Sequence, residues 1–364
     1  MFTAPALSKL RPRIAVERMH EYHPPLAGRE GLRLDFNENT LAPSPRVQTV
    51  LQRISSDSLT KYPEREHVER IAARHFGLDP ASVLLTNGVD EAIHLICETY
   101  LEPNHEVVIV TPTFSMYALY AEATGATVRA VQADATLQFP RERLQQSIGP
   151  DTRLIMLASP NNPTGAVIDP GFLLDLAAAN PQAALLVDEA YYHFHGESVL
   201  SNTSSVENLL VARTFSKAYG LAGLRIGLLA GHADAMRFVR KVSSPYNVNS
   251  IALECLPEAL SDEEYTAWYA DQVRQSRWML EQKLQELNVR YWPTHANFIL
   301  IGIGPEHARF VQAMRQQGVL VRDRSQDPGC EGCVRITLGT VEHTALGIAA
   351  LDKTLKEMQW QPER

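Results

Sequence analysis

The chain has 364 residues, of which 45% are hydrophobic and 21% charged, a composition typical of a folded globular protein rather than a disordered or fibrous one. At roughly 150 residues per domain, this length predicts about two domains. Acidic residues outnumber basic ones by 42 to 34, and this net charge of −8 argues against nucleic acid or an anionic membrane as the main partner.

From about residue 80 to residue 230, short apolar runs alternate with segments that have helical spacing. Strands are expected at 82–86, 106–111, 153–159, 183–188, 208–213 and 225–230. Helices are expected at 65–76, 90–100, 115–124 and 170–179. Because such alternation is typical of βαβ units, we expect the α/β fold class, with a mainly parallel sheet between helices.

The pattern changes after about residue 245. A polar break at 243–250 precedes helical patterns that continue to Leu287. Later runs predict the strands and the last helix of a smaller α+β unit, at 297–303, 318–322, 334–338 and 342–358. We expect a large domain over 36–245 and a small domain formed by 1–35 and 246–364. The N-terminal arm lacks a periodic core face, so we expect it to pack on the small domain or on another chain.

Polar residues follow several of the predicted strands, at the edge where a doubly wound sheet binds its ligands. Thr86-Asn-Gly-Val-Asp-Glu91 opens a helix whose N–H groups suit a phosphate. Phe114 follows the next strand, and Ser159-Pro-Asn-Asn-Pro-Thr-Gly165 places two amides in a tight loop. Each of these features alone is equally typical of a turn, a helix cap or a core residue.

Charged groups at the same edge of the sheet make the prediction of a functional site more specific. An acid that closes a buried strand is costly unless a cation meets it, so Asp188-Glu-Ala-Tyr191 favours a functional role. The following strand leads into Thr214-Phe-Ser-Lys217, and Arg225 comes shortly after. A lysine, two hydroxyls and an arginine so close in sequence predict an anion site around a reactive amine.

One combination of motifs resembles the fold-type I pyridoxal-phosphate (PLP) aminotransferases: Asn162-Pro-Thr-Gly165, Asp188-Glu-Ala-Tyr191, and Ser216-Lys217 with Arg225. More narrowly, four segments resemble the histidinol-phosphate aminotransferases: Leu34-Asp-Phe-Asn-Glu-Asn39, Tyr62-Pro-Glu64, 213–225 and Val334-Arg-Ile-Thr-Leu-Gly339. The resemblance covers nearly the whole chain. It implies PLP as cofactor, a mainly parallel seven-stranded sheet in the large domain, and a homodimer with shared active sites.

The resemblance also implies roles for individual residues. A lysine amine forms a Schiff base with an aldehyde, so Lys217 would hold the cofactor and later move the substrate proton. Asp188 would keep the pyridine nitrogen protonated, and Asn162 and Tyr191 would hydrogen-bond the phenolic oxygen of the ring. The other implied cofactor contacts are Val89 and Asp90 through their backbone N–H groups, Phe114 on the ring face, Thr214, Ser216 and Arg225 at the phosphate, and Tyr62 from the neighbouring subunit.

Two arginines carry the implied substrate specificity. Arg335 matches the family arginine that binds a carboxylate, and Arg322 matches a second arginine that binds a phosphate. Tyr22 and Asn37 would line the same pocket. The implied reaction moves an amino group between L-histidinol phosphate and 2-oxoglutarate, giving imidazole-acetol phosphate and L-glutamate, in histidine biosynthesis.

The cysteines and the N-terminus bear on the cellular compartment. Four scattered cysteines suit reduced thiols better than a disulfide framework. Cys330 and Cys333 form one CxxC without the second ligand pair of a structural zinc site, so we expect a turn that holds two thiols and no metal. Apolar runs are too short for a membrane span, and the first 22 residues have no apolar segment typical of a signal peptide. These features favour the cytoplasm.

Two other enzymatic functions remain open at this point. An aminotransferase for aromatic amino acids would place a flat side chain where the imidazole would bind. A PLP-dependent lyase similar to threonine-phosphate decarboxylase also binds a phosphorylated substrate. A cofactor-sensing regulator would need an added basic DNA-binding unit, for which the chain has no room.

Overall fold

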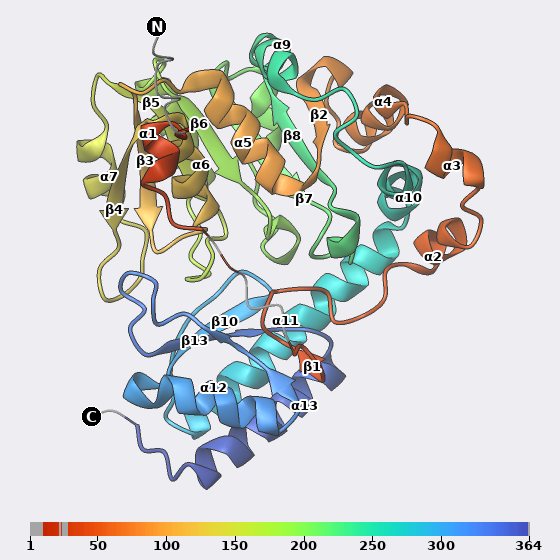
Figure 1. The fold of residues 1–364 in the computed structure, drawn as a ribbon. Helices are drawn as coiled ribbons and strands as arrows, with labels where there is room; N and C mark the ends of the chain where they lie inside the picture. Colours follow the sequence, from red (N-terminus) through yellow and green to blue (C-terminus); the bar gives the residue numbers. More distant parts are fainter. Residues whose placement is uncertain (1–9, 22, 24–27, 363–364) are drawn as a thin grey trace, which may run out of the picture.

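The computed structural model describes residues 10–21, 23 and 28–362. Two units lie one above the other in Figure 1, and the long helix α11 (Glu263–Glu286) runs from one to the other. None of the helices within the described residues is long and apolar enough to cross a membrane.

The large unit is built on a seven-stranded sheet with the order β2-β8-β7-β6-β5-β3-β4. Its strands are β2 (Val83–Thr86), β3 (Glu106–Thr111), β4 (Thr127–Gln132), β5 (Thr152–Ala158), β6 (Ala184–Asp188), β7 (Leu209–Thr214) and β8 (Gly227–Gly231). Only β8 runs antiparallel to its neighbours within this sheet. The α/β fold class with a mainly parallel sheet is therefore confirmed.

Helices cover both faces of this sheet, because successive side chains of a strand point to opposite faces and the strands here are apolar on both. Val83 and Leu85 belong to one core and Leu84 to the other. The first core packs under α2 (Pro45–Leu51), α4 (Arg65–His75), α7 (Arg141–Ser147), α8 (Pro170–Ala179) and α10 (Ser250–Ser261). The second packs under α5 (Gly88–Tyr100), α6 (Met116–Thr124) and α9 (Ala233–Val242). The short helix α3 (Ser56–Thr60) lies near α10.

The small unit combines two short sheets with three helices. The antiparallel sheet β12-β13-β10-β9 consists of β9 (Arg290–Trp292), β10 (Phe298–Gly302), β12 (Arg322–Asp323) and β13 (Cys333–Thr337). A second sheet pairs β1 (Leu32–Arg33) in parallel with β11 (Val319–Leu320). Its core forms between α11, α12 (His307–Gln316) and α13 (Val341–Glu357). The strand β1 ties the beginning of the chain to this unit.

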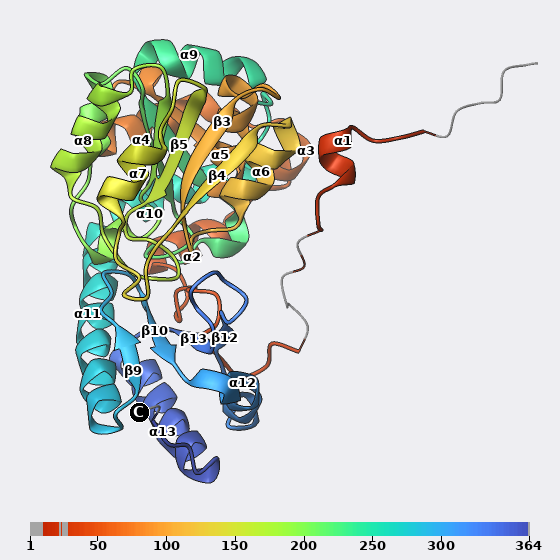
Figure 2. The same ribbon diagram turned by 90° about the vertical axis from the view of Figure 1, so that its left-hand side faces the viewer.

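Two packing contacts bear on the expected domain limits. Helix α10 packs into the core of the large unit, so we propose a boundary between α10 and α11 instead of residue 245. The N-terminal helix α1 (Ile14–Glu17) lies against α6 of the large unit, with the Arg13 guanidinium donating to the carbonyl of Ala123 at 2.7 Å (Figure 2). Within its own chain the arm therefore contacts the large unit at α1 and the small unit at β1.

Candidate active site

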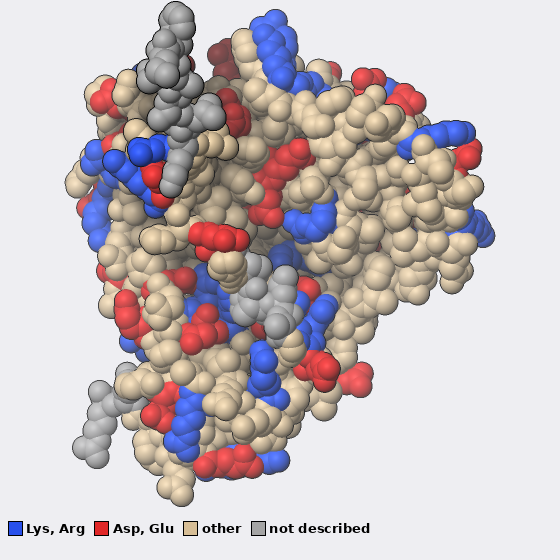
Figure 3. All heavy atoms as spheres, viewed as in Figure 1, with Lys and Arg blue, Asp and Glu red and all other residues tan. Residues whose placement is uncertain are grey.

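A cavity of about 590 Å³ lies where the carboxyl ends of the large sheet meet the small unit. This volume is in the range that holds a small cofactor together with a substrate. On the face in Figure 3, several Lys and Arg side chains gather at the level where the two units meet. The cavity is therefore cationic although the chain as a whole is acidic.

Lys217 reaches this cavity from the loop that follows β7. Its Nζ donates to the backbone carbonyl of Phe36 at 2.9 Å rather than to a carboxylate. Burial lowers the pKa of Lys217 to about 8, and the nearby Arg335 contributes to this lowering. About a tenth of the amine is therefore neutral at pH 7, far more than for an ordinary lysine, and this is the form that attacks an aldehyde or accepts a proton.

Asp188 closes β6, the strand beside β7, and lines the same cavity. It accepts hydrogen bonds from the Tyr117 hydroxyl at 2.7 Å and from the Ala190 N–H at 2.9 Å, and from no lysine or arginine among the described residues. Burial raises the pKa of the Asp188 carboxyl to about 6, against the effect of these two hydrogen bonds. The site thus holds an acid that lacks a cation and an amine that lacks an anion.

These features fit the phosphorylated pyridine aldehyde that the resemblance implies. An aldehyde would use the Lys217 amine, and a protonated ring nitrogen would supply the cation that Asp188 lacks. The Ser216 hydroxyl is buried and has no hydrogen-bond partner in the part of the chain that the structure describes, so it is available to a ligand oxygen. A Cβ at Gly88, whose φ is +75°, would come within 2.6 Å of the Arg225 guanidinium. Only glycine therefore allows this arginine to approach the start of α5.

The cationic end of the cavity suits a phosphate. Val89 and Asp90 form the first turn of α5, where free N–H groups and the helix dipole favour an anion. The Arg225 guanidinium contacts the Asp90 carboxylate at 3.1 Å. Thr214 and Ser216 line the same region, and the Thr214 hydroxyl accepts from the Ser216 N–H at 3.1 Å.

A hydrogen-bond network joins the two units at the other end of the cavity. The Asn37 amide donates to the Tyr191 hydroxyl at 2.9 Å. Arg335 of β13 donates to the Asn162 side chain and, at 2.8 Å, to the carbonyl of Asp35. Arg322 of β12 lies directly opposite Arg335 in the sheet register. The small unit therefore contributes cations to a site whose reactive groups come from the large unit.

Most of the residues predicted from the sequence lie around this one cavity. They are Asn37, Val89, Asp90, Phe114, Asn162, Asp188, Tyr191, Thr214, Ser216, Lys217, Arg225, Arg322 and Arg335. Tyr62 does not reach it: its side chain is 80% exposed and stacks on Tyr246, with ring centroids 4.3 Å apart. Tyr22 lies outside the described residues.

Similarity to known proteins identifies the family of this chain. Residues 29–351 match the aminotransferase class I and II family. The chain belongs to that family. The histidinol-phosphate aminotransferase of Moorella thermoacetica is 31% identical over 96% of this chain and 92% of its own length. Histidinol-phosphate aminotransferase 1 of Trichormus variabilis is 31% identical over 94% of this chain and 98% of its own length.

A solved structure supports the fold of this aminotransferase. The histidinol-phosphate aminotransferase of Sinorhizobium meliloti, in complex with pyridoxal-5′-phosphate, superposes with a TM-score of 0.85 at 23% identity. The match covers 97% of this chain and 99% of that one. The sequence resemblance to histidinol-phosphate aminotransferases is therefore confirmed, and with it the fold-type I architecture.

Tyr117, Arg324 and the supporting residue Asn161 are among those in and around the site that were not predicted from the sequence. Tyr117 lies within α6 and holds Asp188, but an aromatic residue in a helix is more often core. Arg324 lines the cavity two residues after Arg322, where strand alternation is a usable signal. Asn161 precedes Asn162 in a loop where the resemblance assigns a role only to the second amide.

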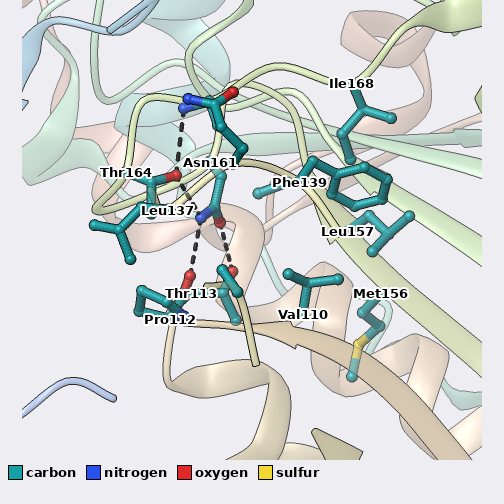
Figure 4. Close-up of a pocket in the computed structure, with 14 residues that line it drawn as sticks. Val110, Pro112, Thr113, Leu137, Phe139, Met156, Leu157, Asn161, Thr164 and Ile168 are labelled. Carbon is teal, nitrogen blue, oxygen red and sulfur yellow. Dashed lines mark hydrogen bonds between the residues drawn. The ribbon is translucent and has the colours of Figure 1, made fainter. Parts of the chain in front are cut away.

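Asn161 fixes the loop that carries Asn162. Its amide donates to the Pro112 carbonyl and to the Thr164 hydroxyl, both at 2.9 Å, and accepts from the Thr113 hydroxyl at 2.7 Å (Figure 4). These bonds lie beside an apolar cavity of about 20 Å³ lined by side chains that include Val110. Asn161 therefore holds the loop in place, while Asn162 lines the active-site cavity.

Proposed function

We propose that this aminotransferase, with PLP bound, moves an amino group between L-histidinol phosphate and 2-oxoglutarate. The products are imidazole-acetol phosphate and L-glutamate, and the pathway is histidine biosynthesis. The observation that carries this substrate is the pair Arg322 and Arg335, which face each other in adjacent strands on the wall of the cavity that holds Lys217. Guanidinium forks bind both a phosphate monoester and a carboxylate, which this reaction requires in its two halves.

The cofactor would be held by residues already described. Thr214, Ser216, Arg225 and the start of α5 would bind its phosphate, and Phe114 would lie against its ring. When bound, PLP supplies an aldehyde that bonds amines and a ring that accepts the electrons of a substrate C–H bond. The protein supplies the anchoring, the orientation and the proton transfers.

The chain's own groups divide the proton transfers between them. Lys217 Nζ, whose charged form is disfavoured by burial, would move the proton between the substrate carbon and the C4′ carbon of the cofactor. The Asp188 carboxylate would hold a proton on the ring nitrogen, and the Tyr117 hydroxyl fixes the orientation of that carboxylate. Asn37 fixes the Tyr191 hydroxyl beside the reactive amine, whose Nζ lies 5.9 Å from the tyrosine ring centroid.

The amino donor is tested by mixing the holoenzyme with one donor and no acceptor. We expect L-histidinol phosphate to fade the yellow colour of the cofactor at least about 10²-fold faster than L-histidinol at equal low concentration, because buried guanidiniums would stay unpaired without the phosphate. Absorbance in a stopped-flow instrument measures both rates. If phenylalanine fades the colour and L-histidinol phosphate does not, the aromatic enzyme is correct instead. Release of carbon dioxide from threonine phosphate would indicate the lyase.

A cytoplasmic homodimer with shared active sites is part of the same proposal. The four cysteines are free thiols, in agreement with a reducing compartment. Leu51, Leu59, Tyr62 and Tyr246 are exposed large hydrophobic residues of the segments around α2, α3 and α10. The stacked rings of Tyr62 and Tyr246 would belong to the subunit interface, and Tyr62 would reach the cofactor phosphate of the partner subunit from it.

Mixing two inactive variants tests the sharing. We expect Lys217→Ala and Tyr62→Ala to be weakly active alone and to regain activity after they are unfolded together and refolded. In a mixed dimer, one site has both its own Lys217 and an intact tyrosine from the partner. Steady-state rates against the separately refolded variants measure the gain. Mixed dimers with no gain would show that Tyr62 acts within its own chain or not at all.

A further inference from the structure

Three arginines lie on one face of the small unit's sheet. Arg322 is paired in register with Arg335. Two residues further along, the backbone N–H of Arg324 donates to the carbonyl of Cys333 at 2.9 Å, so the pairing of the two chain segments continues to Arg324. Alternation along a strand brings residues 322 and 324 to the same side. Like charges placed side by side in a sheet are destabilising, so three adjacent guanidiniums favour a ligand over a structural role. All three line the cavity that holds Lys217.

Arg324 is only partly neutralised by the protein. Its guanidinium forms an ion pair with Asp327, which a tight turn places beside it, since the Asp327 N–H donates to the Arg324 carbonyl at 2.9 Å. Its Nε is buried and has no hydrogen-bond partner among the described residues. Arg324 and Arg322 also contribute, after burial itself, to a lowered pKa of the buried Arg335, which indicates that the three charges act on one another. Both Arg324 and Asp327 are mostly buried, with side chains 14% and 25% exposed.

The charges of this group match a dianion. Three arginines and Asp327 together carry a net charge of +2, since 3 − 1 = 2. A phosphate monoester near neutral pH carries nearly two negative charges, whereas a carboxylate carries one. A single carboxylate in the place of the phosphate therefore leaves part of the positive charge unpaired, which is costly in a site withdrawn from water.

We propose that Arg324 is a third binding residue for the phosphate of the amino donor and sets the preference for phosphorylated over carboxylate donors. Asp327 is its positioning residue, holding the guanidinium toward the cavity until the phosphate binds. This inference rests on the proposed function, because it concerns the donor of that reaction.

The variant Arg324→Gln of the holoenzyme tests the proposal. We expect the KM for L-histidinol phosphate to rise about tenfold or more with kcat nearly unchanged, because one charge-assisted contact is lost in binding. The KM for L-glutamate should change much less. Inorganic phosphate, used as a competitive inhibitor of the glutamate reaction, should bind more weakly by a similar factor. Arg324→Lys should restore part of the affinity, since it keeps the charge and loses the fork.

Arg309→Gln is the matched control, because Arg309 is exposed on α12 and its guanidinium pairs with Glu306 at 3.0 Å, away from the cavity. Equal increases in KM for both donors, or no increase for either, would overturn the role of Arg324. If the wild type does not react with L-histidinol phosphate, the proposed function fails on its own. Weaker inhibition by inorganic phosphate in Arg324→Gln would still support Arg324 as an anion ligand in that case, and unchanged inhibition would refute it.

Discussion

Replacing Lys217 by Ala should lower the rate of amino transfer by on the order of 10⁴-fold, the upper range for loss of a general acid–base group. The variant loses both the amine that bonds the cofactor and the base that moves the substrate proton. Folding should be little affected, because Nζ makes one hydrogen bond, to the carbonyl of Phe36, and is held in a cavity that already disfavours its charge. Steady-state rates and a thermal unfolding curve of the same preparation measure both effects.

Two controls separate this chemical role from damage to the fold. Lys241→Ala removes an amine from α9, outside the cavity, and should retain wild-type activity. A small primary amine added to Lys217→Ala should restore part of the rate, because it supplies a base where the side chain was removed. Borohydride reduction of the wild-type holoenzyme should attach the cofactor to Lys217. Attachment to another lysine would contradict the assignment.

Much of the fold follows from local patterns in the sequence. The strands β3 and β6 lie within one residue of their expected limits, because buried parallel strands are continuous apolar runs bounded by turns. The edge strand β4 has no such signal. Its sequence, Thr127–Gln132, is largely exposed and lacks an apolar run, so only its pairing with β3 reveals it.

Long-range packing explains what the sequence does not predict. The polar break at 243–250 suggests a domain boundary, but α10 still buries Leu253 and Leu256 against the large unit. The apolar side chains Leu10, Ile14 and Val16 of the N-terminal arm are exposed, so its position depends on single contacts, such as the bond from Arg13 to the carbonyl of Ala123. The helical spacing of α10 is visible in the sequence, but the unit against which its apolar face packs is not.

The reactive residues of the candidate site were easier to predict than the residues that hold them in position. Reactive residues such as Lys217 and Asp188 follow strands, and the carboxyl ends of parallel strands converge whatever the loops between them. No such rule predicts the position of residues that act through another side chain. Tyr117 holds Asp188 from a helix 71 positions earlier in the chain, and its hydroxyl is recognisable as functional only when the two are seen together.

Asp188→Asn should lower kcat by about 10²–10³-fold while KM changes little, because the carboxylate stabilises a charge that develops in the transition state. Asparagine has nearly the same shape and can still accept from the Tyr117 hydroxyl, so the loss reports the negative charge rather than the packing. Asp234→Asn on α9 is the control, since that carboxylate is 74% exposed, and it should leave kcat unchanged.

The same substitution should have the opposite effect on the thermal stability of the apoprotein, where it should be stabilising. Burial raises the folded-state pKa of Asp188 from its ordinary value of 3.8 to about 6, so the folded apoprotein loses stability as the pH rises from 3.8 to about 6, and the full cost is present above that. Asparagine removes that cost. The apo form of Asp188→Asn should therefore unfold at a higher temperature than the wild type above pH 6, and the difference should shrink as the pH falls toward 4. Adding PLP should reverse the order, because only the wild type gains the pairing between the carboxylate and the protonated ring. An equal gain from PLP in both proteins would mean that Asp188 does not meet the ring nitrogen.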